Sequence, residues 1–394
     1  MTPGSRAWTL SVANALGMIG VVSFPAIAPQ LQSAWGLTNT EVGWLGGIYF
    51  AGYVAFVPIL TGLTDRISPR RIVIAGFILS AIASAGFGWF ATDFWSASFW
   101  RFLAGVGFAG SYMPAMKALS DTVEPYARHR VISIYSASFS VGVSLSYFGT
   151  GWLTGLVGYE AAFAVLSVLP LAAAVLAMTC LPPGGAAAGS GMPDFRKALR
   201  NRRAIAFFIA YAVHNGESST ARSWIVPLLA AASIAWPGGA EAWQGTITSF
   251  VAIANLGGLF VILAAGWLAA PVGLERLVVM VIFTSAGLGI LLGAGIGFGP
   301  AFVLTVAGLY ILAAPADAGL LNSGLVSRTE PDVLGATMAL HATIAFTAAF
   351  LFPVLFGLVL DLAGGAWVVA FIALAAMTSL GPFALRRLDR PGQN

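Results

Sequence analysis

The chain has 394 residues, of which 58% are hydrophobic and only 9% are charged. Soluble globular proteins average about 25% charged residues, so this composition excludes an ordinary soluble protein. The net charge of +4, from 19 basic and 15 acidic residues, is too small over this length for a nucleic-acid-binding surface, and we expect no nucleic-acid partner. A single cysteine excludes an internal disulfide and a multi-cysteine metal site. The composition is that of a polytopic membrane protein.

Twelve apolar runs are long enough to cross a bilayer, for which a helix needs about 20 mostly apolar residues. In chain order, the predicted membrane helices cover residues 8–28, 42–61, 71–91, 97–118, 131–153, 160–180, 203–232, 243–268, 276–296, 300–322, 336–360 and 366–385. These runs are too long and continuous for the strands of a membrane barrel, which alternate in polarity. We therefore predict an all-α polytopic membrane protein of twelve transmembrane helices, the first of which is retained and is not a signal peptide.

The longest hydrophilic stretch separates the first six runs from the last six. It begins at Pro182 and Pro183, continues with glycine, alanine and serine, and ends in a basic run. This pattern predicts a flexible linker followed by a short amphipathic helix on the membrane surface. The predicted organisation is an N-terminal six-helix bundle at residues 1–180, a cytoplasmic linker at 181–202 and a C-terminal six-helix bundle at 203–394.

Basic residues gather on one side of the predicted membrane. Sixteen of the 19 lie in the termini, the linker and the loops of that side. The opposite loops have acidic residues and no Lys or Arg; these are Glu41, Asp93, Glu160, Glu241 and Asp361. Because Lys and Arg are retained in cytoplasmic loops, we predict a multi-pass protein of the inner (plasma) membrane with both termini in the cytoplasm.

The two halves of the chain match one another. Three pairs of segments align at a nearly constant offset of 205 or 206 residues: Gly151–Gly158 with Gly357–Gly364, Glu124–Pro125 with Glu330–Pro331, and Thr61–Arg71 with Gly266–Arg276. Each pair occupies the same kind of helix junction. The offset predicts two homologous six-helix halves.

Two motifs of the first half follow known patterns. In the loop Thr61–Arg71 the matching residues are Leu63, Asp65, Arg66, Arg70 and Arg71, whereas Thr61, Ser68 and Pro69 depart from the pattern Gly-x-Leu-Ala-Asp-Arg-x-Gly-Arg-Arg. This loop resembles the signature loop of the major facilitator superfamily of secondary transporters. In the fourth predicted helix, Arg101, Gly105 and Gly107 resemble a second motif of that family, Arg-x-x-x-Gly-x-Gly. The resemblance covers all twelve spans and implies two pseudo-symmetric six-helix bundles.

The signature loop carries an acid and three bases. The resemblance implies that Asp65, Arg66, Arg70 and Arg71 form a gate that closes the cytoplasmic side, with Asp65 meeting the start of the eleventh helix. A carboxylate is favourable at such a helix end because it opposes the positive end of the helix dipole. The alternative is that the arginines only hold the loop in the cytoplasm.

Lys117 lies near the cytoplasmic end of the fourth helix, in the place that Asp317 takes in the second half. We predict that these two residues pair when the cytoplasmic side closes, so that Lys117 belongs to the gate. The alternative is an ion pair between Lys117 and Asp121, which lies one turn further along the same helix. His341, early in the eleventh helix, is the alternative partner of Asp317 and is assigned with it to proton coupling.

The seventh helix carries the polar segment His214–Ser223 between two apolar runs. Charged groups within a membrane are costly and usually functional, and such segments are typical of the interrupted helices at transporter binding sites. We expect His214, Asn215 and Arg222 to bind substrate and Glu217 to couple protons. The alternative is an exposed loop between two half-spans.

Deep polar residues also occur in helices 1, 4 and 10. Arg101 and Tyr112 share one stripe of helix 4, Tyr310 and Asp317 share one of helix 10, and Asn14 lies in helix 1. We expect Asn14, Arg101, Tyr112 and Tyr310 to bind substrate and Asp317 to couple protons. The alternatives are snorkelling for Arg101, packing for Tyr112 and inter-helix hydrogen bonding for Asn14. The resemblance implies that helices 1, 4, 7 and 10 line the central cavity.

These features predict a secondary active transporter that moves a small organic anion by alternating access, coupled to protons. Arg101 and Arg222 favour an anion because a guanidinium binds carboxylates through two hydrogen bonds. Glu217 and Asp317 are the expected proton carriers because burial favours the neutral form of a carboxyl group. Expected partners are a small-molecule substrate, protons and the lipid bilayer, and we expect a monomer.

The same residues allow other functions. Proton-driven efflux of cationic drugs would use Glu217 and Asp317 as cation sites, but the fifth helix lacks the Gly-Pro-rich pattern associated with drug antiporters. A non-transporting membrane receptor is a third interpretation. The chain has none of the protease, hydrolase or nucleotide-binding motifs, so we expect no enzyme and no cofactor. Its three histidines, His129, His214 and His341, have no metal-binding spacing.

Overall fold

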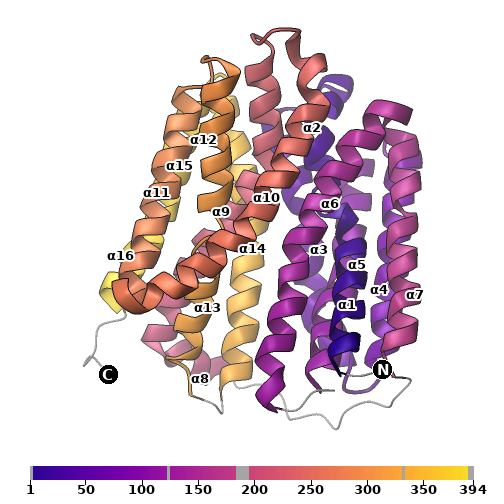
Figure 1. The fold of residues 1–394 in the computed structure, drawn as a ribbon, viewed down its shortest axis with the longest axis vertical. Helices are drawn as coiled ribbons and strands as arrows, with labels where there is room; N and C mark the ends of the chain where they lie inside the picture. Colours follow the sequence, from indigo (N-terminus) through magenta and orange to yellow (C-terminus); the bar gives the residue numbers. More distant parts are fainter. Residues whose placement is uncertain (1–2, 122–124, 183–194, 331–332, 389–394) are drawn as a thin grey trace. The chain divides into compact units, whose positions relative to one another are not determined.

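The computed structural model describes residues 3–121, 125–182, 195–330 and 333–388, and every regular element in these ranges is a helix (Figure 1). Residues 183–194 of the expected linker, Glu124 and Pro331 of the repeated junctions, and the side chain of Asp121 lie outside the described residues. The helices of the first half are α1 (Pro3–Gly17), the 3₁₀ turn η1 (Met18–Gly20), α2 (Ser23–Trp35), α3 (Asn39–Leu63), α4 (Pro69–Phe90), α5 (Phe94–Asp121), α6 (Pro125–Leu166) and α7 (Val168–Cys180). Those of the second half are α8 (Phe195–Arg200), α9 (Arg202–Ser233), α10 (Gly239–Val272), α11 (Leu274–Ala294), α12 (Pro300–Ala313), α13 (Ala318–Val326), α14 (Leu334–Leu362), α15 (Trp367–Thr378) and α16 (Leu380–Leu388).

The helices account for the twelve predicted spans. Within the described ranges, nine helical segments are long and apolar enough to cross a membrane. One of them, Val131–Cys180, holds two spans that meet at Gly158, whose φ of +80° lies in the left-handed region that favours glycine. The remaining two spans are α5 and α9, the long helices that carry buried charged residues.

Large apolar side chains cover much of the outer surface. On α10, Ile253, Phe260 and Trp267 are spaced seven residues apart and are 70%, 75% and 79% exposed. A stripe of this size on a soluble protein would promote aggregation, whereas a bilayer solvates it. The surface therefore agrees with a multi-pass membrane protein.

The first span is broken, which corrects the expectation of one helix at residues 8–28. α1 ends at Gly17, η1 follows, and α2 begins at Ser23. Pro25 explains the break, because a proline has no N–H to donate to the carbonyl four residues earlier, which here belongs to Val21. The break leaves backbone acceptors in the middle of a membrane span.

The tenth span is broken as well, in place of the single helix expected at residues 300–322. α12 ends at Ala313 and α13 begins at Ala318. Pro315 lies in the connecting turn and cannot donate to the carbonyl of Ile311. Asp317 is therefore the residue just before α13, and its side chain does not cap that helix. It does not share a continuous helical stripe with Tyr310, as the sequence had suggested.

By contrast, the seventh span is continuous. α9 runs without a break from Arg202 to Ser233, and most of the polar segment His214–Ser223 is buried. Both the interruption suggested by this pattern and the alternative of an exposed loop are wrong. The break that a polar mid-membrane segment predicts lies instead in the tenth span.

The chain forms two compact units. Unit 1 comprises Met1–Gly36, Ile48–Ser190 and Thr248–Leu256, and unit 2 comprises Leu37–Gly47, Gly191–Ile247 and Gly257–Asn394. In unit 1, α4 packs along α5, and α1 packs against α6 and α7 (Figure 1). In unit 2, α9 packs against α14 and α16, and α11 packs against α15. Each unit contains its own cluster of buried polar residues.

Candidate functional site

A buried histidine–aspartate pair lies at the break of the tenth span in unit 2. The Nδ1 atom of His214 on α9 is 2.6 Å from Oδ1 of Asp317, and the two side chains are only 6% and 2% exposed. The second carboxylate oxygen, Oδ2, is buried and has no hydrogen-bond partner among the described residues. Ser218, one turn after His214, donates to the carbonyl of Ala314 at 3.4 Å, in the turn before α13. α9 therefore supplies polar partners for the backbone break.

An aromatic stack extends this pair. The Tyr211 ring stacks with the rings of His214 and His341, with centroid distances of 5.5 and 4.0 Å and interplanar angles of 18° and 15°. Nε2 of His341 is 3.2 Å from Oδ1 of Asn322, whose amide group donates to the Tyr211 hydroxyl at 3.4 Å. Nδ1 of His341 is buried without a partner in the described part of the chain. The stack brings two imidazoles and one carboxylate into one connected group.

Glu217 is a second titratable group that α9 contributes to this site, after His214. Its side chain is 3% exposed, lies beside Ser285 of α11 and interacts electrostatically with Asp317 and Tyr310. The Tyr310 hydroxyl is also buried and lacks a hydrogen-bond partner within the described residues. Two carboxyl groups, an imidazole and a phenol thus share an interior with little access to water.

The rest of the polar segment on α9 is less buried. The Asn215 amide donates to the carbonyl of Tyr211 on its own helix, at 3.0 Å. Arg222 is half-buried and lies eight residues beyond His214, about 12 Å further along the helix axis. The structure therefore brings His214, Glu217 and Asp317 together and places Arg222 away from them.

In unit 1 the buried cation lies at the other helix break. Arg101 on α5 is 2% exposed and donates to the carbonyl oxygens of Gly20 and Val21, at 2.6 and 3.1 Å. Its guanidinium carbon lies 5.3 Å from the ring centroid of Tyr49 and 5.9 Å from that of Phe24. The Val21 carbonyl is the one that Pro25 leaves without a backbone donor. Snorkelling to the outer headgroups, the alternative for Arg101, is wrong because the side chain points into the unit.

Asn14 and Tyr112 belong to a polar network between helices of the same unit. The Asn14 amide donates to Oγ of Ser138 at 2.8 Å, and the Tyr135 hydroxyl lies 3.3 Å from the side-chain oxygen Oδ1 of Asn14 and 3.1 Å from the backbone carbonyl oxygen of Tyr112. The Tyr112 and Tyr135 rings stack at 5.5 Å. Asn14 thus forms inter-helix hydrogen bonds and Tyr112 packs against another ring, as the alternatives for these residues predict.

The signature loop forms an ion pair with the fourth span. Nζ of Lys117 on α5 lies 2.9 Å from Oδ1 of Asp65 and donates to the Thr64 hydroxyl, also at 2.9 Å. Arg66 and Arg71 are exposed, whereas Arg70 is half-buried and donates to the carbonyl of Met178 at 2.7 Å. Lys117 and Asp317 each have a partner in their own unit, and their pairing in another conformation stays a prediction.

Unit 2 has a corresponding ion pair that sequence reasoning missed. Arg328, just beyond α13, donates to Glu275 in the first turn of α11 at 2.6 Å. Its guanidinium also lies 4.6 Å from the Phe207 ring centroid. In both units the loop after the second span is thus joined to the end of the fourth span. The duplication had suggested the two loops, but not this pairing, since Arg328 and Glu275 are 53 residues apart.

Tyr211, Asn322 and Tyr49 were also missed. A tyrosine or asparagine in an apolar span has no distinguishing pattern, and Asn322 could have been noticed only as a deep amide. Among the described residues, no group of three His, Cys, Asp or Glu side chains could hold a metal ion.

Comparison with known proteins identifies relatives. The family model described as Major Facilitator Superfamily matches residues 10–327. An Arabidopsis thaliana protein named "Probable sphingolipid transporter spinster homolog 1" is 26% identical over 42% of this chain and 34% of its own length. The niacin transporter NiaP of Acinetobacter baylyi is 28% identical over 36% of this chain and 29% of its own length. The 3-(3-hydroxy-phenyl)propionate transporter of Escherichia coli is 30% identical over 41% of this chain and 40% of its own length.

These matches span about a third of the length of the curated relatives. A crystal structure of a bacterial homologue of the human lysosomal transporter Spinster covers 100% of both chains, with a TM-score of 0.81 and 15% identity. Such a likeness establishes the fold, the expected twelve-helix arrangement. The relatives are named as transporters and not as enzymes, in agreement with the sequence prediction.

Proposed function

We propose that this chain, which belongs to the Major Facilitator Superfamily, is a secondary active transporter that moves a small organic anion by alternating access and couples this movement to protons. The observation that carries the proposal is the buried His214–Asp317 pair beside Glu217, at the broken tenth span. Charged and titratable groups are costly inside a membrane domain and are typically retained for function.

Proton coupling is assigned to Glu217, Asp317 and His341. Asp317 and His214 are close enough to share a proton, and Glu217 interacts electrostatically with Asp317. The unpartnered Oδ2 of Asp317 and Nδ1 of His341 are sites where a proton or a ligand group can add. A change in the protonation of His214 or Asp317 would alter the attraction between α9 and the turn before α13. Proton binding would in this way shift the balance between conformations.

Substrate binding is assigned to the basic and hydrogen-bonding groups near the two broken spans. These residues are Asn14, Arg101, Tyr112, His214, Asn215, Arg222 and Tyr310. The guanidinium groups of Arg101 and Arg222 favour an anionic solute. Two relatives are named for niacin and for 3-(3-hydroxy-phenyl)propionate, which are both aromatic carboxylic acids. An aromatic carboxylate is therefore the first substrate class to test.

The membrane arrangement follows the charge asymmetry. We assign the protein to the inner (plasma) membrane, with both termini and the linker 181–202 in the cytoplasm. We further propose that it is a monomer. The halves 1–180 and 203–394 are the parts that would move in alternating access. We assign five residues to the cytoplasmic gate: Asp65, Arg66, Arg70, Arg71 and Lys117. The Lys117–Asp65 ion pair supports this assignment.

The test uses the full chain in liposomes with an imposed pH gradient. Radiolabelled niacin and 3-(3-hydroxyphenyl)propionate probe the anion, and tetraphenylphosphonium probes a hydrophobic cation. We expect gradient-driven accumulation of a carboxylate and its loss in Asp317→Asn and Glu217→Gln, with substrate exchange at zero gradient retained. Glu330→Gln is the matched control, since Glu330 is an exposed acid with a 70% exposed side chain.

Cation movement against protons with no carboxylate transport would replace the anion by the drug-efflux alternative. Accumulation that is unchanged in Asp317→Asn and Glu217→Gln would refute the coupling assignment. If no probe and no related carboxylate moves although the protein binds them, the receptor interpretation would take the place of transport.

A further inference from the structure

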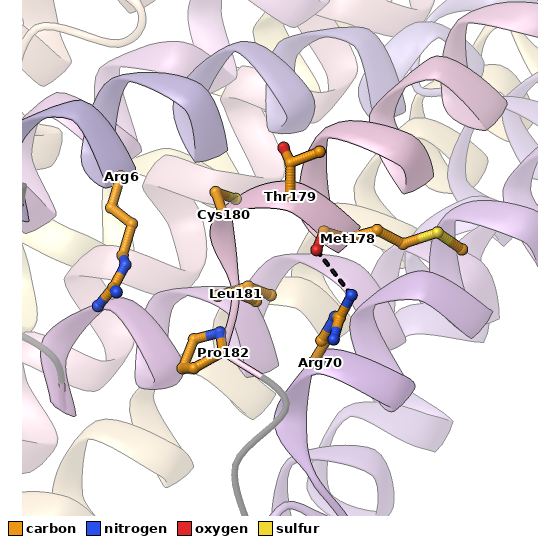
Figure 2. Close-up of a pocket in the computed structure, with 7 residues that line it drawn as sticks. All are labelled: Arg6, Arg70, Met178, Thr179, Cys180, Leu181 and Pro182. Carbon is orange, nitrogen blue, oxygen red and sulfur yellow. Dashed lines mark hydrogen bonds between the residues drawn. The ribbon is translucent and has the colours of Figure 1, made fainter. Parts of the chain in front are cut away.

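A cavity of about 360 Å³ lies in unit 1, at the end of the unit where α1 begins and α7 ends. Arg6, Arg70 and residues 178–182 line it, and Figure 2 shows the two arginines on either side of the Cys180–Pro182 segment. This volume lies in the range of small-molecule sites, about 300–1,000 Å³. None of the residues that line the cavity is assigned above to substrate binding or proton coupling, although Arg70 belongs to the proposed gate.

The cavity is positively charged. Arg6 lies in the first turn of α1 and Arg70 in the first turn of α4, where the helix dipoles add partial positive charge. Neither helix has an acidic residue in its first turn, and none of the described residues that line the cavity is acidic. The carbonyl groups at the C-terminal end of α7 (Val168–Cys180) carry partial negative charge and oppose the two cations in part, and a bound anion would add the remaining compensation.

The donors of this site are only partly used. One terminal nitrogen of Arg70 donates to the carbonyl of Met178 at 2.7 Å, drawn as the dashed line in Figure 2. The Nε atoms of both Arg6 and Arg70 are buried and have no hydrogen-bond partner among the described residues. Buried donors are normally paired, so these two nitrogens indicate an oxyanion that accepts from them.

The cavity borders an apolar outer surface. On α7, Leu171, Val175 and Met178 follow helical spacing and are 44%, 58% and 42% exposed. Trp8 and Val12, one and two turns beyond the start of α1, are exposed as well, and α1 packs against α7. A ligand whose phosphate occupies the cavity could therefore lay apolar chains along these helices.

We infer that the Arg6–Arg70 cavity binds the phosphate group of an anionic phospholipid, with the acyl chains on the exposed apolar side of α1 and α7. Arginine forms paired hydrogen bonds with phosphate oxygens, and basic pockets between membrane helices hold anionic headgroups. The apolar border favours a lipid over a free phosphate, which would gain nothing from it. The cytoplasmic leaflet follows from the orientation proposed above, whereas the site itself does not depend on transport.

The test measures bound lipid and not transport, because Arg70 also belongs to the proposed gate. The full chain is reconstituted in vesicles of phosphatidylglycerol and phosphatidylcholine, released, and weighed with its retained lipids by native mass spectrometry. We expect selective retention of phosphatidylglycerol, reduced about 30-fold in Arg6→Gln/Arg70→Gln, since each basic residue near an anionic membrane contributes roughly fivefold. Arg276→Gln is the control: it removes an exposed arginine in unit 2 at the position that the duplication aligns with Arg71.

The wild-type protein provides a second readout that does not depend on a variant folding. Cys180 is the only cysteine of the chain and lines the cavity. Its side chain is only 2% exposed, so a small thiol reagent should reach it slowly and by way of the cavity, and phosphatidylglycerol should slow this reaction further than phosphatidylcholine does. Equal labelling rates together with equal retention of the two lipids would overturn the site. If inorganic phosphate protects Cys180 as strongly as phosphatidylglycerol does, the assignment of a lipid ligand is wrong and the cavity binds a free oxyanion.

Discussion

Arg101 donates hydrogen bonds to the carbonyl oxygens of Gly20 and Val21 and so satisfies the backbone where the first span breaks. Unit 2 has a related arrangement, in which His214 and Ser218 contact Asp317 and Ala314 at the break of the tenth span. In each unit a proline interrupts the helix, and a polar side chain of another span hydrogen-bonds to the backbone carbonyls at the interruption. Residues that the sequence marked as substrate ligands are thus also structural partners of broken helices.

Arg101→Lys should destabilise unit 1. A lysine ammonium is a single point charge and cannot reproduce the planar contacts with two carbonyls and two rings. Leaving one buried acceptor unpaired costs about 1–3 kcal/mol. Thermal unfolding in detergent measures this loss, and Arg276→Lys, at an exposed position, should match the wild type. A melting temperature of Arg101→Lys equal to that of the control would contradict the structural role.

Gly105→Ala should disrupt the packing of α5 against α3. A Cβ at Gly105 would overlap the carbonyl oxygen of Tyr49, which is backbone and cannot move aside cheaply. Overpacking of this kind costs typically about 1–3 kcal/mol. Gly155→Ala is the matched control, because a Cβ at Gly155 on α6 meets no atom within 4 Å.

Alanine at Gly155 is expected to be neutral or slightly stabilising, since glycine in a helix interior is less favourable than alanine. Yield and melting temperature of the two variants, measured side by side, check this difference. Similar behaviour of both would mean that α3 and α5 are not packed as closely as the structure shows.

The Lys117–Asp65 ion pair should contribute little to stability. Its side chains are 31% and 38% exposed, and exposed pairs typically contribute about 0.2–1 kcal/mol. A double-mutant cycle with Lys117→Met and Asp65→Asn should therefore give a small coupling energy of unfolding. If the pair acts in the gate, the same variants lose transport far more than stability. A coupling energy well above this range would show that the pair mainly stabilises the folded unit.

Asp93 should make stability depend on pH. Its Oδ1 accepts from the backbone N–H and the hydroxyl of Ser96, both at 2.8 Å, before the first turn of α5. The Ser96 backbone and side-chain hydrogen bonds lower the pKa of Asp93 below its ordinary value. With a lowered folded-state pKa, the stabilisation is present above the unfolded-state pKa and is lost as the pH falls through the folded-state value.

Asp93→Asn should therefore cost stability at neutral pH, and the difference from wild type should shrink as the pH falls below the ordinary pKa of an aspartate. Ser96→Ala removes the hydroxyl donor and should show part of the same pH dependence. Melting temperatures across this range provide the measurement. A deficit in Asp93→Asn that stays constant down to acidic pH would show that its charge is not the cause.

The two helix breaks show where sequence patterns stop being informative. Pro25 and Pro315 lie in apolar runs, and hydropathy does not register the loss of one N–H donor. The polar segment on α9 was expected near an interruption, yet α9 is continuous and the interruption lies in the tenth span opposite it. The helix partner of a broken segment is a tertiary property, which the local pattern does not contain.

The sequence by itself determined that this is a membrane protein with twelve spans, an asymmetric distribution of charge and two related halves. These properties follow from the transfer of each side chain between water and lipid, which depends on residue type and local order. Only the tertiary structure decided that His214 meets Asp317 across 103 residues, that Arg328 meets Glu275, and that Arg6 and Arg70 share one cavity. Hydrogen bonds and ion pairs act over about 3 Å, so their partners are chosen by how the helices pack.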